Sequence, residues 1–94
     1  MKRKLGPFYD PLKAKFINLC VKKHVETNFY LSSISAKKIL AKICPNLTGI
    51  IIDVLISSVG RLNFENFIAL LEKTAAKVKV EVELFYTQVI AYET

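Results

Sequence analysis

The sequence predicts an all-α protein of four to five helices, arranged as paired helix–loop–helix units with a long C-terminal helix. Apolar residues recur at steps of three and four over most of the chain, which is the helical period. Proline, glycine and capping residues divide the chain into helix-sized segments. Only one segment alternates like a strand, and no second strand is present to pair with it.

Length and composition favour a single small domain with more apolar surface than a core of this size would bury. The chain has 94 residues, of which 52% are hydrophobic, and its mean hydropathy is +0.32. One domain is the expectation at this length. The excess of apolar residues requires a dense core, an oligomer interface or a groove filled by a partner.

We divide the chain into a basic N-terminal arm (1–10), a helical EF-hand-like domain (11–76) and a C-terminal helical extension (77–94). The arm contains a Gly-Pro pair, which disfavours helix. Asp10 is a suitable N-cap and Pro11 suits the first helical position, so the first helix is expected to run from Pro11 to about Val25.

The second helix is expected to begin at a cap at Ser33 or Ser35 and to run to about Ile43, before Pro45. Its lysines alternate with apolar positions, which predicts an amphipathic helix with one buried and one solvent-exposed face.

The third helix is capped by Asn46 or Thr48 and runs to about Ser58. It is nearly all apolar. Such a helix lies at the centre of a core or is covered by a partner.

The fourth helix begins at a cap at Asn63, after Gly60 stops the third. One apolar stripe then predicts a single long helix, with or without a kink, from Asn63 towards the end of the chain. Residues 77–84 also alternate as a strand would, and a strand here would imply strand exchange in a dimer. Lysine–glutamate pairs four residues apart favour helix. The stripe comprises Phe64, Phe67, Leu71, Ala75, Val78, Val82, Phe85, Val89 and Tyr92.

Two stretches, SISAKKIL (33–40) and GRLNFENF (60–67), each place an apolar residue beside a turn and a helix start. Together they resemble a degenerate EF-hand pair, such as a single lobe of calmodulin or of a myosin light chain, over about residues 12–73. The resemblance implies a short bridge between the two loops, made by Ile34 and Leu62. It also implies a groove that accepts an amphipathic helix.

The loops depart from the family pattern at the positions that bind calcium. An EF-hand loop needs several oxygen ligands and a bidentate glutamate at its end. If the first loop is aligned on Ile34, it has no carboxylate and Lys38 stands at the glutamate position. If the second is aligned on Leu62, Asn66 takes that position and Leu55 the first-ligand position. We therefore expect calcium independence, no metal and no cofactor.

No enzyme is expected from the residues that carry chemistry. The single histidine, His24, lies four residues after Cys20, but no third residue is placed to orient the ring. Glu81 and Glu83 are flanked by lysines, and three scattered glycines make no phosphate loop. Cys20 and Cys44 are expected to be buried free thiols.

The basic residues are concentrated in the first part of the chain. Residues 1–42 hold ten lysines and arginines against two acids, whereas residues 43–94 hold four against six. The basic part, residues 1–42, could bind an acidic partner, an anionic surface or nucleic acid. A helix-turn-helix is disfavoured because the third helix carries core residues where base-reading polar residues belong. The expected basic surface consists of Lys22, Lys23, Lys37, Lys38 and Lys42.

The function expected from these patterns is a non-enzymatic interaction or adaptor module. It binds a partner helix or a second copy of itself through apolar surface; the alternative is a small basic nucleic-acid-binding protein with a lysine-rich face. Neither a secretory signal nor a membrane-length apolar run is present, so a cytoplasmic or nuclear location is expected. The expected partner-binding residues are Phe67, Leu71, Val78, Val82, Phe85, Val89 and Tyr92.

Overall fold

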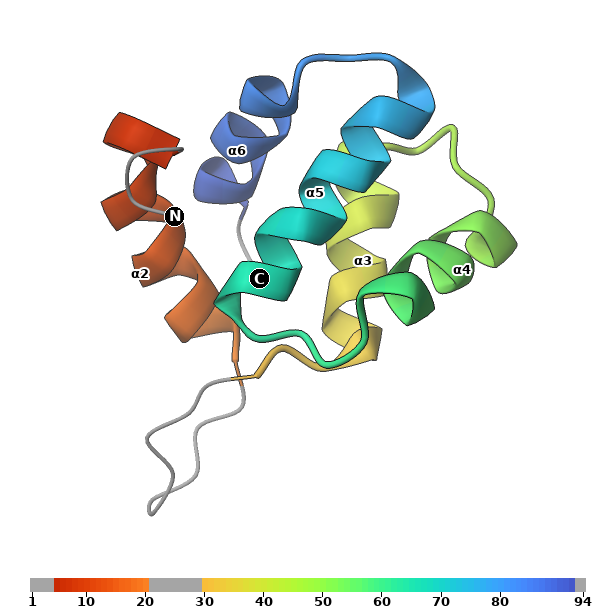
Figure 1. Ribbon diagram of the computed structural model, residues 1–94, viewed down its shortest axis with the longest axis horizontal. Helices are drawn as coiled ribbons and strands as arrows, with labels where there is room; N and C mark the ends of the chain where they lie inside the picture. The colour runs from red at the N-terminus through yellow and green to blue at the C-terminus, as the bar shows by residue number, and fades with distance from the viewer. Residues whose placement is uncertain (1–4, 21–29, 93–94) are drawn as a thin grey trace.

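The structure is a computed structural model that describes residues 5–20 and 30–92. This part of the chain is built from helices and contains no extended strand, so the all-α class is confirmed (Figure 1). None of its helices combines the length and the apolar character needed to cross a membrane. The elements are η1 (Gly6–Phe8), α2 (Tyr9–Leu19), α3 (Ser33–Ile43), α4 (Gly49–Val59), α5 (Phe64–Val78) and α6 (Val82–Ala91).

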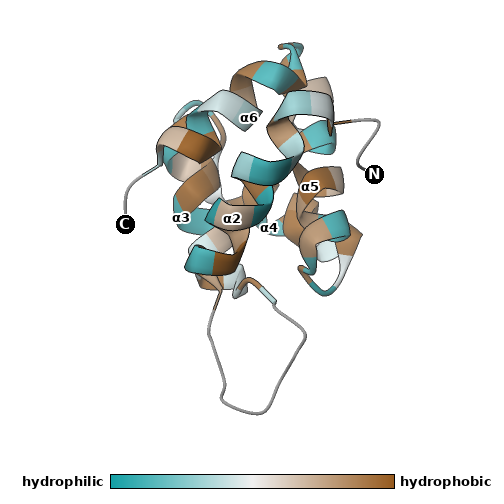
Figure 2. Cartoon of the chain, turned by 90° about the vertical axis from the view of Figure 1, so that its left-hand side faces the viewer, coloured by the Kyte–Doolittle hydropathy of each residue, from teal (hydrophilic) through white to brown (hydrophobic). Residues whose placement is uncertain are grey.

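Helix α5 runs through the middle of the molecule, with α2 and α6 on one side and α4 on the other (Figure 1). It packs against α4 and α6, while α6 also packs against α2 and α3. Helices α2, α5 and α6 carry both hydrophobic and hydrophilic segments, as amphipathic helices do (Figure 2). The largest fully buried side chains are Leu12, Phe16, Ile39, Leu40, Ile52, Phe67, Ile68, Leu70, Leu71, Thr74 and Val89.

The N-terminal segment is helical earlier than expected. Residues 6–8 form a 3₁₀ turn with Pro7 near its start, and α2 already begins at Tyr9. Proline fixes a helix-compatible φ angle at such a position, and Leu5 is buried in the core. Tertiary packing therefore overrides the helix-breaking pair, and Asp10 lies in the first turn instead of capping the helix. The described helix ends at Leu19, and the expected end near Val25 lies outside the described residues.

Side-chain caps fix the starts of the three middle helices. The Asn63 side chain accepts a hydrogen bond of 2.8 Å from the Asn66 amide, and Thr48 caps α4 in the same way at 3.3 Å. Both residues were expected as caps. Helix α3 is capped by Ser32, one residue before the expected candidates, through a 3.1 Å bond from the Ser35 amide. Each cap satisfies an amide that the first helical turn leaves unpaired.

The apolar stripe at the C-terminal end is divided between two helices, which corrects the expectation of one continuous helix. Lys79 adopts the left-handed conformation, with φ 58° and ψ 43°, and the Val80 amide donates to the Ala75 carbonyl at 3.1 Å. A left-handed residue at this position is a common helix end. The reversal allows α6 to fold back, which buries Phe85 and Val89.

The two loops meet in a single antiparallel bridge. It joins Leu31 to Leu62, and both side chains are buried. A bridge was expected here, but with Ile34 as the partner of Leu62. Ile34 instead lies in the first turn of α3 with 69% of its surface exposed. The partner of Leu62 is therefore Leu31, three positions before the expected Ile34.

Candidate functional site

The apolar residues expected to bind a partner lie inside the domain. Phe67, Leu71, Phe85 and Val89 are fully buried in the shared core. The remaining three are partly buried and pack against that core: Val78, Val82 and Tyr92. The C-terminal part of the stripe folds back onto its own domain. These seven side chains therefore form core, not a free surface.

Helix α6 is held against η1 at its middle and against α2 at its C-terminal end. At its middle, the rings of Phe8 and Tyr86 lie with centroids 5.5 Å apart. At its end, the Lys15 ammonium donates a 2.6 Å hydrogen bond to the Tyr92 carbonyl. Lys42 of α3 lies over the Tyr92 ring, 5.6 Å from its centroid. These contacts fix the segment that the sequence presents as a candidate interface.

The outer face of α4 is the most exposed apolar surface of the described residues. Ile50 is 78% exposed and Val54 is 63% exposed, and they lie one helical turn apart. Ile52 and Ile56 on the opposite side are buried. Because the apolar residues of α4 lie on all of its sides, burying one face leaves apolar side chains on the other. The Ile50 and Val54 side chains are therefore largely exposed, and no helix of residues 5–20 and 30–92 covers them.

A shallow groove borders this face, between α3 and α4. It has a volume of about 340 Å³. Ile34 of α3 lines it, opposite Asp53 and Ser57 of α4. The Lys37 ammonium crosses the groove and lies 3.3 Å from the Asp53 carboxylate. We call Ile34, Ile50 and Val54 together the α4 patch.

The lysines expected to form a basic surface do not all present free charges. Lys22 and Lys23 lie outside the described residues. Lys37 is paired with Asp53, and Lys42 lies over the Tyr92 ring. Lys38 is exposed on α3. The pairing with Asp53 is exposed and weak, of about 0–1 kcal/mol, but it reduces the positive charge beside the α4 patch.

The cysteines do not offer a nucleophile. Both Cys20 and Cys44 are buried free thiols, as expected. Burial raises the pKa of the Cys20 thiol to about 11, so the thiol is protonated near neutral pH. His24, its possible partner, lies outside the described residues.

The second loop is closed by its own hydrogen bonds. The Asn66 side-chain amide donates to the Arg61 carbonyl at 2.6 Å, and the Asn66 backbone amide donates to the Asn63 side chain. The Arg61 guanidinium lies over the Tyr30 ring, 4.8 Å from its centroid. Over residues 5–20 and 30–92, no three histidine, cysteine or acidic side chains are grouped so that they could hold a metal ion.

Comparison of the chain with protein-family models, with curated proteins and with solved structures found no match. The α4 patch was not among the residues expected from the sequence. The only available signal was the composition of α4, which is too apolar for a helix that buries a single face.

Proposed function

We propose that this chain is a non-enzymatic protein-interaction module that binds an amphipathic helix of a partner protein through the α4 patch, without calcium. One observation carries the proposal: Ile50 and Val54 are largely exposed and one turn apart on the same helix face. Apolar anchors spaced in this way are typical of helix-to-helix recognition.

The α4 patch would contribute apolar burial to a contact with a helix. Fully burying an isoleucine or valine side chain is worth about 1.5–3 kcal/mol. Three such side chains are exposed here: Ile34 lines the groove, and Ile50 and Val54 lie on the outer face of α4. Most of the binding energy of an interface comes from a few such residues.

Charge favours an acidic partner helix. The chain has a formal net charge of +6. Lys37 flanks the patch on the α3 side, and Lys73 of α5 reaches Ser58 at 3.2 Å on the other side. Acidic residues beside the apolar anchors of the partner would meet the Lys73 ammonium, and they would compete with Asp53 for the Lys37 ammonium. Such complementarity mainly increases the association rate and fixes orientation.

The degenerate EF-hand pair remains our proposal for the relationship of this fold. Two helix–loop–helix units, α2–α3 and α4–α5, support it, together with the bridge between Leu31 and Leu62. In this interpretation, α6 occupies the groove in which the family accepts a partner's helix, because it packs against α2, α3 and α5. A partner would then use the outer face of α4.

A designed peptide tests the α4 patch directly. The probe is a fluorescent amphipathic helix with leucines four residues apart and glutamates beside them, measured by fluorescence anisotropy. The double variant Ile50→Ser/Val54→Ser is expected to bind at least about tenfold more weakly, since each 1.4 kcal/mol is a factor of ten. The matched control is Leu84→Ser, which removes a side chain that is 56% exposed on α6 and should leave affinity unchanged. Equal losses in both variants, or no loss in the double variant, would overturn the proposal.

Salt separates this proposal from nucleic-acid binding by the lysine-rich face. Apolar anchoring keeps most of its affinity at high salt, whereas phosphate binding falls steeply with salt concentration. The same anisotropy titration, repeated with a labelled nucleic-acid duplex, gives the comparison. Salt-sensitive binding of the duplex together with no binding of the peptide would favour the alternative.

Self-association is examined by light scattering over a range of protein concentrations. A monomer is expected, since the proposal places the second helix in another protein. A salt-resistant dimer that Ile50→Ser/Val54→Ser dissociates would make a second copy of this chain the occupant of the patch and would overturn the partner-helix assignment.

A further inference from the structure

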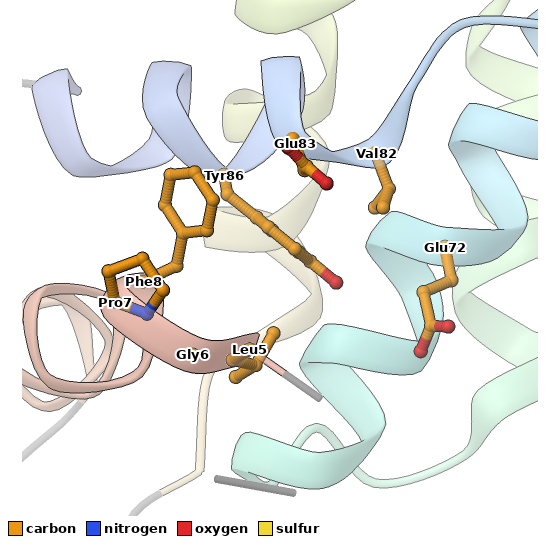
Figure 3. A pocket seen from close by; sticks show the side chains of 8 residues that line it. All are labelled: Leu5, Gly6, Pro7, Phe8, Glu72, Val82, Glu83 and Tyr86. Carbon is orange, nitrogen blue, oxygen red and sulfur yellow. The ribbon is translucent and has the colours of Figure 1, made fainter. Parts of the chain in front are cut away.

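A second hollow lies between η1, α5 and α6, and α4 contributes nothing to its lining (Figure 3). Its volume is about 330 Å³, which is within the lower range of ligand sites. Leu5, Pro7 and Phe8 form an apolar wall on one side. The hollow is therefore separate from the α4 patch and does not depend on the function proposed for that patch.

Tyr86 of α6 is the central polar group of this hollow. Its side chain is 97% buried, with 3% of its surface exposed, and its ring packs against Phe8. The hydroxyl points into the space between α6 and α5 (Figure 3). It has no hydrogen-bond partner within the described residues. Every fully buried side-chain nitrogen or oxygen atom in the described residues has a hydrogen-bond partner. Because the Tyr86 hydroxyl has none, it is not fully buried and must be accessible from the hollow.

Two carboxylates give the hollow a negative potential. Glu72 of α5 and Glu83 of α6 line it from two different helices (Figure 3). Burial, and then the charges of Glu72 and Glu83, raise the pKa of Tyr86 to about 12. Glu72 already has an interaction of its own, so we assign it only a contribution of charge, and the oxygens that would bind a ligand are those of Glu83 and Tyr86.

We propose that this hollow binds a primary ammonium or guanidinium group on an apolar stem, as presented by a lysine or arginine side chain of a partner protein. The cation would donate hydrogen bonds to the Tyr86 hydroxyl and the Glu83 carboxylate, and a bond between charged groups is stronger than a neutral one. The stem would pack along Leu5, Pro7 and Phe8, since lysine and arginine bury their methylene groups on apolar surface.

The test uses three probes, followed through backbone amide chemical shifts in the full chain. They are a short peptide with one lysine, the same peptide with norleucine in its place, and free butylammonium. The lysine peptide is expected to saturate shifts around Tyr86 and Glu83, and the norleucine peptide is not. Tighter binding of the peptide than of butylammonium assigns the site to a protein side chain, whereas equal binding keeps the cation site and assigns it to a free amine.

Conservative variants decide whether the hollow itself is responsible. Glu83→Gln and Tyr86→Phe each keep the shape of the side chain and are expected to weaken lysine-peptide binding at least about fivefold. Glu65→Gln, an exposed residue of α5 outside the hollow, is the matched control and should change binding less than about twofold. Equal binding by the lysine and norleucine peptides, or wild-type affinity in both hollow variants, would overturn the proposal.

A third variant keeps the test decisive if the wild-type chain shows no saturation. The sequence places Lys2, Arg3 and Lys4 directly before Leu5, so these cations are candidates to compete for the same charges. The triple glutamine variant removes them and is expected to bind the lysine peptide at least as tightly as the wild-type chain. Absence of saturation in both chains would overturn the proposal, and neither outcome bears on the α4 patch.

Discussion

The backbone amide of Leu31 donates a 2.9 Å hydrogen bond to the carbonyl of Leu62, across the two loops that precede α3 and α5. Both side chains are buried. This bridge joins residues from the two helix–loop–helix units and fixes the starts of α3 and α5 relative to each other. The backbone conformation at Gly60, two residues before Leu62, can therefore be tested by mutation.

Gly60 ends α4 in a conformation that other residues rarely adopt, with φ 72° and ψ −141°. We expect Gly60→Ala to lower the free energy of unfolding by about 1–3 kcal/mol, because a Cβ strains this backbone. Gly49→Ala is the matched control, since Gly49 is helical and its Cβ would make ordinary contact with Lys37 at 3.6 Å. That variant should raise stability by up to about 1 kcal/mol. Urea unfolding measures both, and similar effects of the two changes would contradict the strain at Gly60.

The two sides of α4 should differ sharply in their tolerance of truncation. Ile52→Ala removes buried methyl groups and is expected to lower the free energy of unfolding by about 2–5 kcal/mol. Ile50→Ala changes an exposed position and should stay within about 0.5 kcal/mol. Thermal or urea unfolding of both variants gives the comparison. A large loss from Ile50→Ala would mean that this side chain is covered in solution.

Excess calcium should leave the melting temperature unchanged. A ligand that binds only the folded state raises stability with its concentration, and the loop around Asn66 is closed by hydrogen bonds to Arg61 and Asn63. Thermal melts with calcium, with magnesium and with chelator provide the measurement and its control. An increase of several degrees that is specific to calcium would overturn the proposal of a calcium-independent module.

Tyr86 should make the protein less stable at high pH. Its pKa is raised from 10.0 to about 12 in the folded state, so between these values the unfolded chain ionises more readily than the folded one. Stability is therefore lost as pH rises through this window, by at most about 2.5 kcal/mol. Tyr86→Phe removes this contribution, and Tyr92→Phe, at a residue outside the hollow, should not. Urea unfolding at about pH 9 and about pH 11.5 measures the difference between the variants, and parallel curves for wild type and Tyr86→Phe would contradict the raised pKa.

Local signals in the sequence predicted most helix boundaries. Thr48 and Asn63 cap α4 and α5 as expected, because a cap depends only on residues two or three positions away. The break at Lys79 was not predicted, since the apolar stripe continues in helical phase on both sides of it. The packing of α6 against α5, α2 and α3 makes the reversal favourable, and contacts with α2 and α3, which are distant in the sequence, have no signature in a local pattern.

The candidate sites were harder to predict than the fold. Seven of the eleven residues of α4 are large and apolar and they lie on every side of the helix, so the exposure of Ile50 and Val54 follows from where α3 and α5 pack. The hollow around Tyr86 needs Phe8 and Tyr86 to meet, although they are distant in the sequence. The regular apolar stripe through Phe85 and Val89 was interpreted as an interface, but both residues lie in the core. The sequence does not separate the two cases, because a helix that packs in a core and a helix that packs on a partner have the same apolar pattern.

The pairing of α2 with α6 has a consequence for how the chain is made. Lys15 donates its hydrogen bond to the Tyr92 carbonyl, 77 positions further along the sequence. The apolar side of α2 therefore emerges from the ribosome long before α6, its partner helix. Helices α3, α4 and α5 are synthesised in the interval and lie next to one another in the finished fold. During that interval Leu12 and Phe16 would be open to chaperones, and assembly of the nascent chain is completed only when α6 arrives.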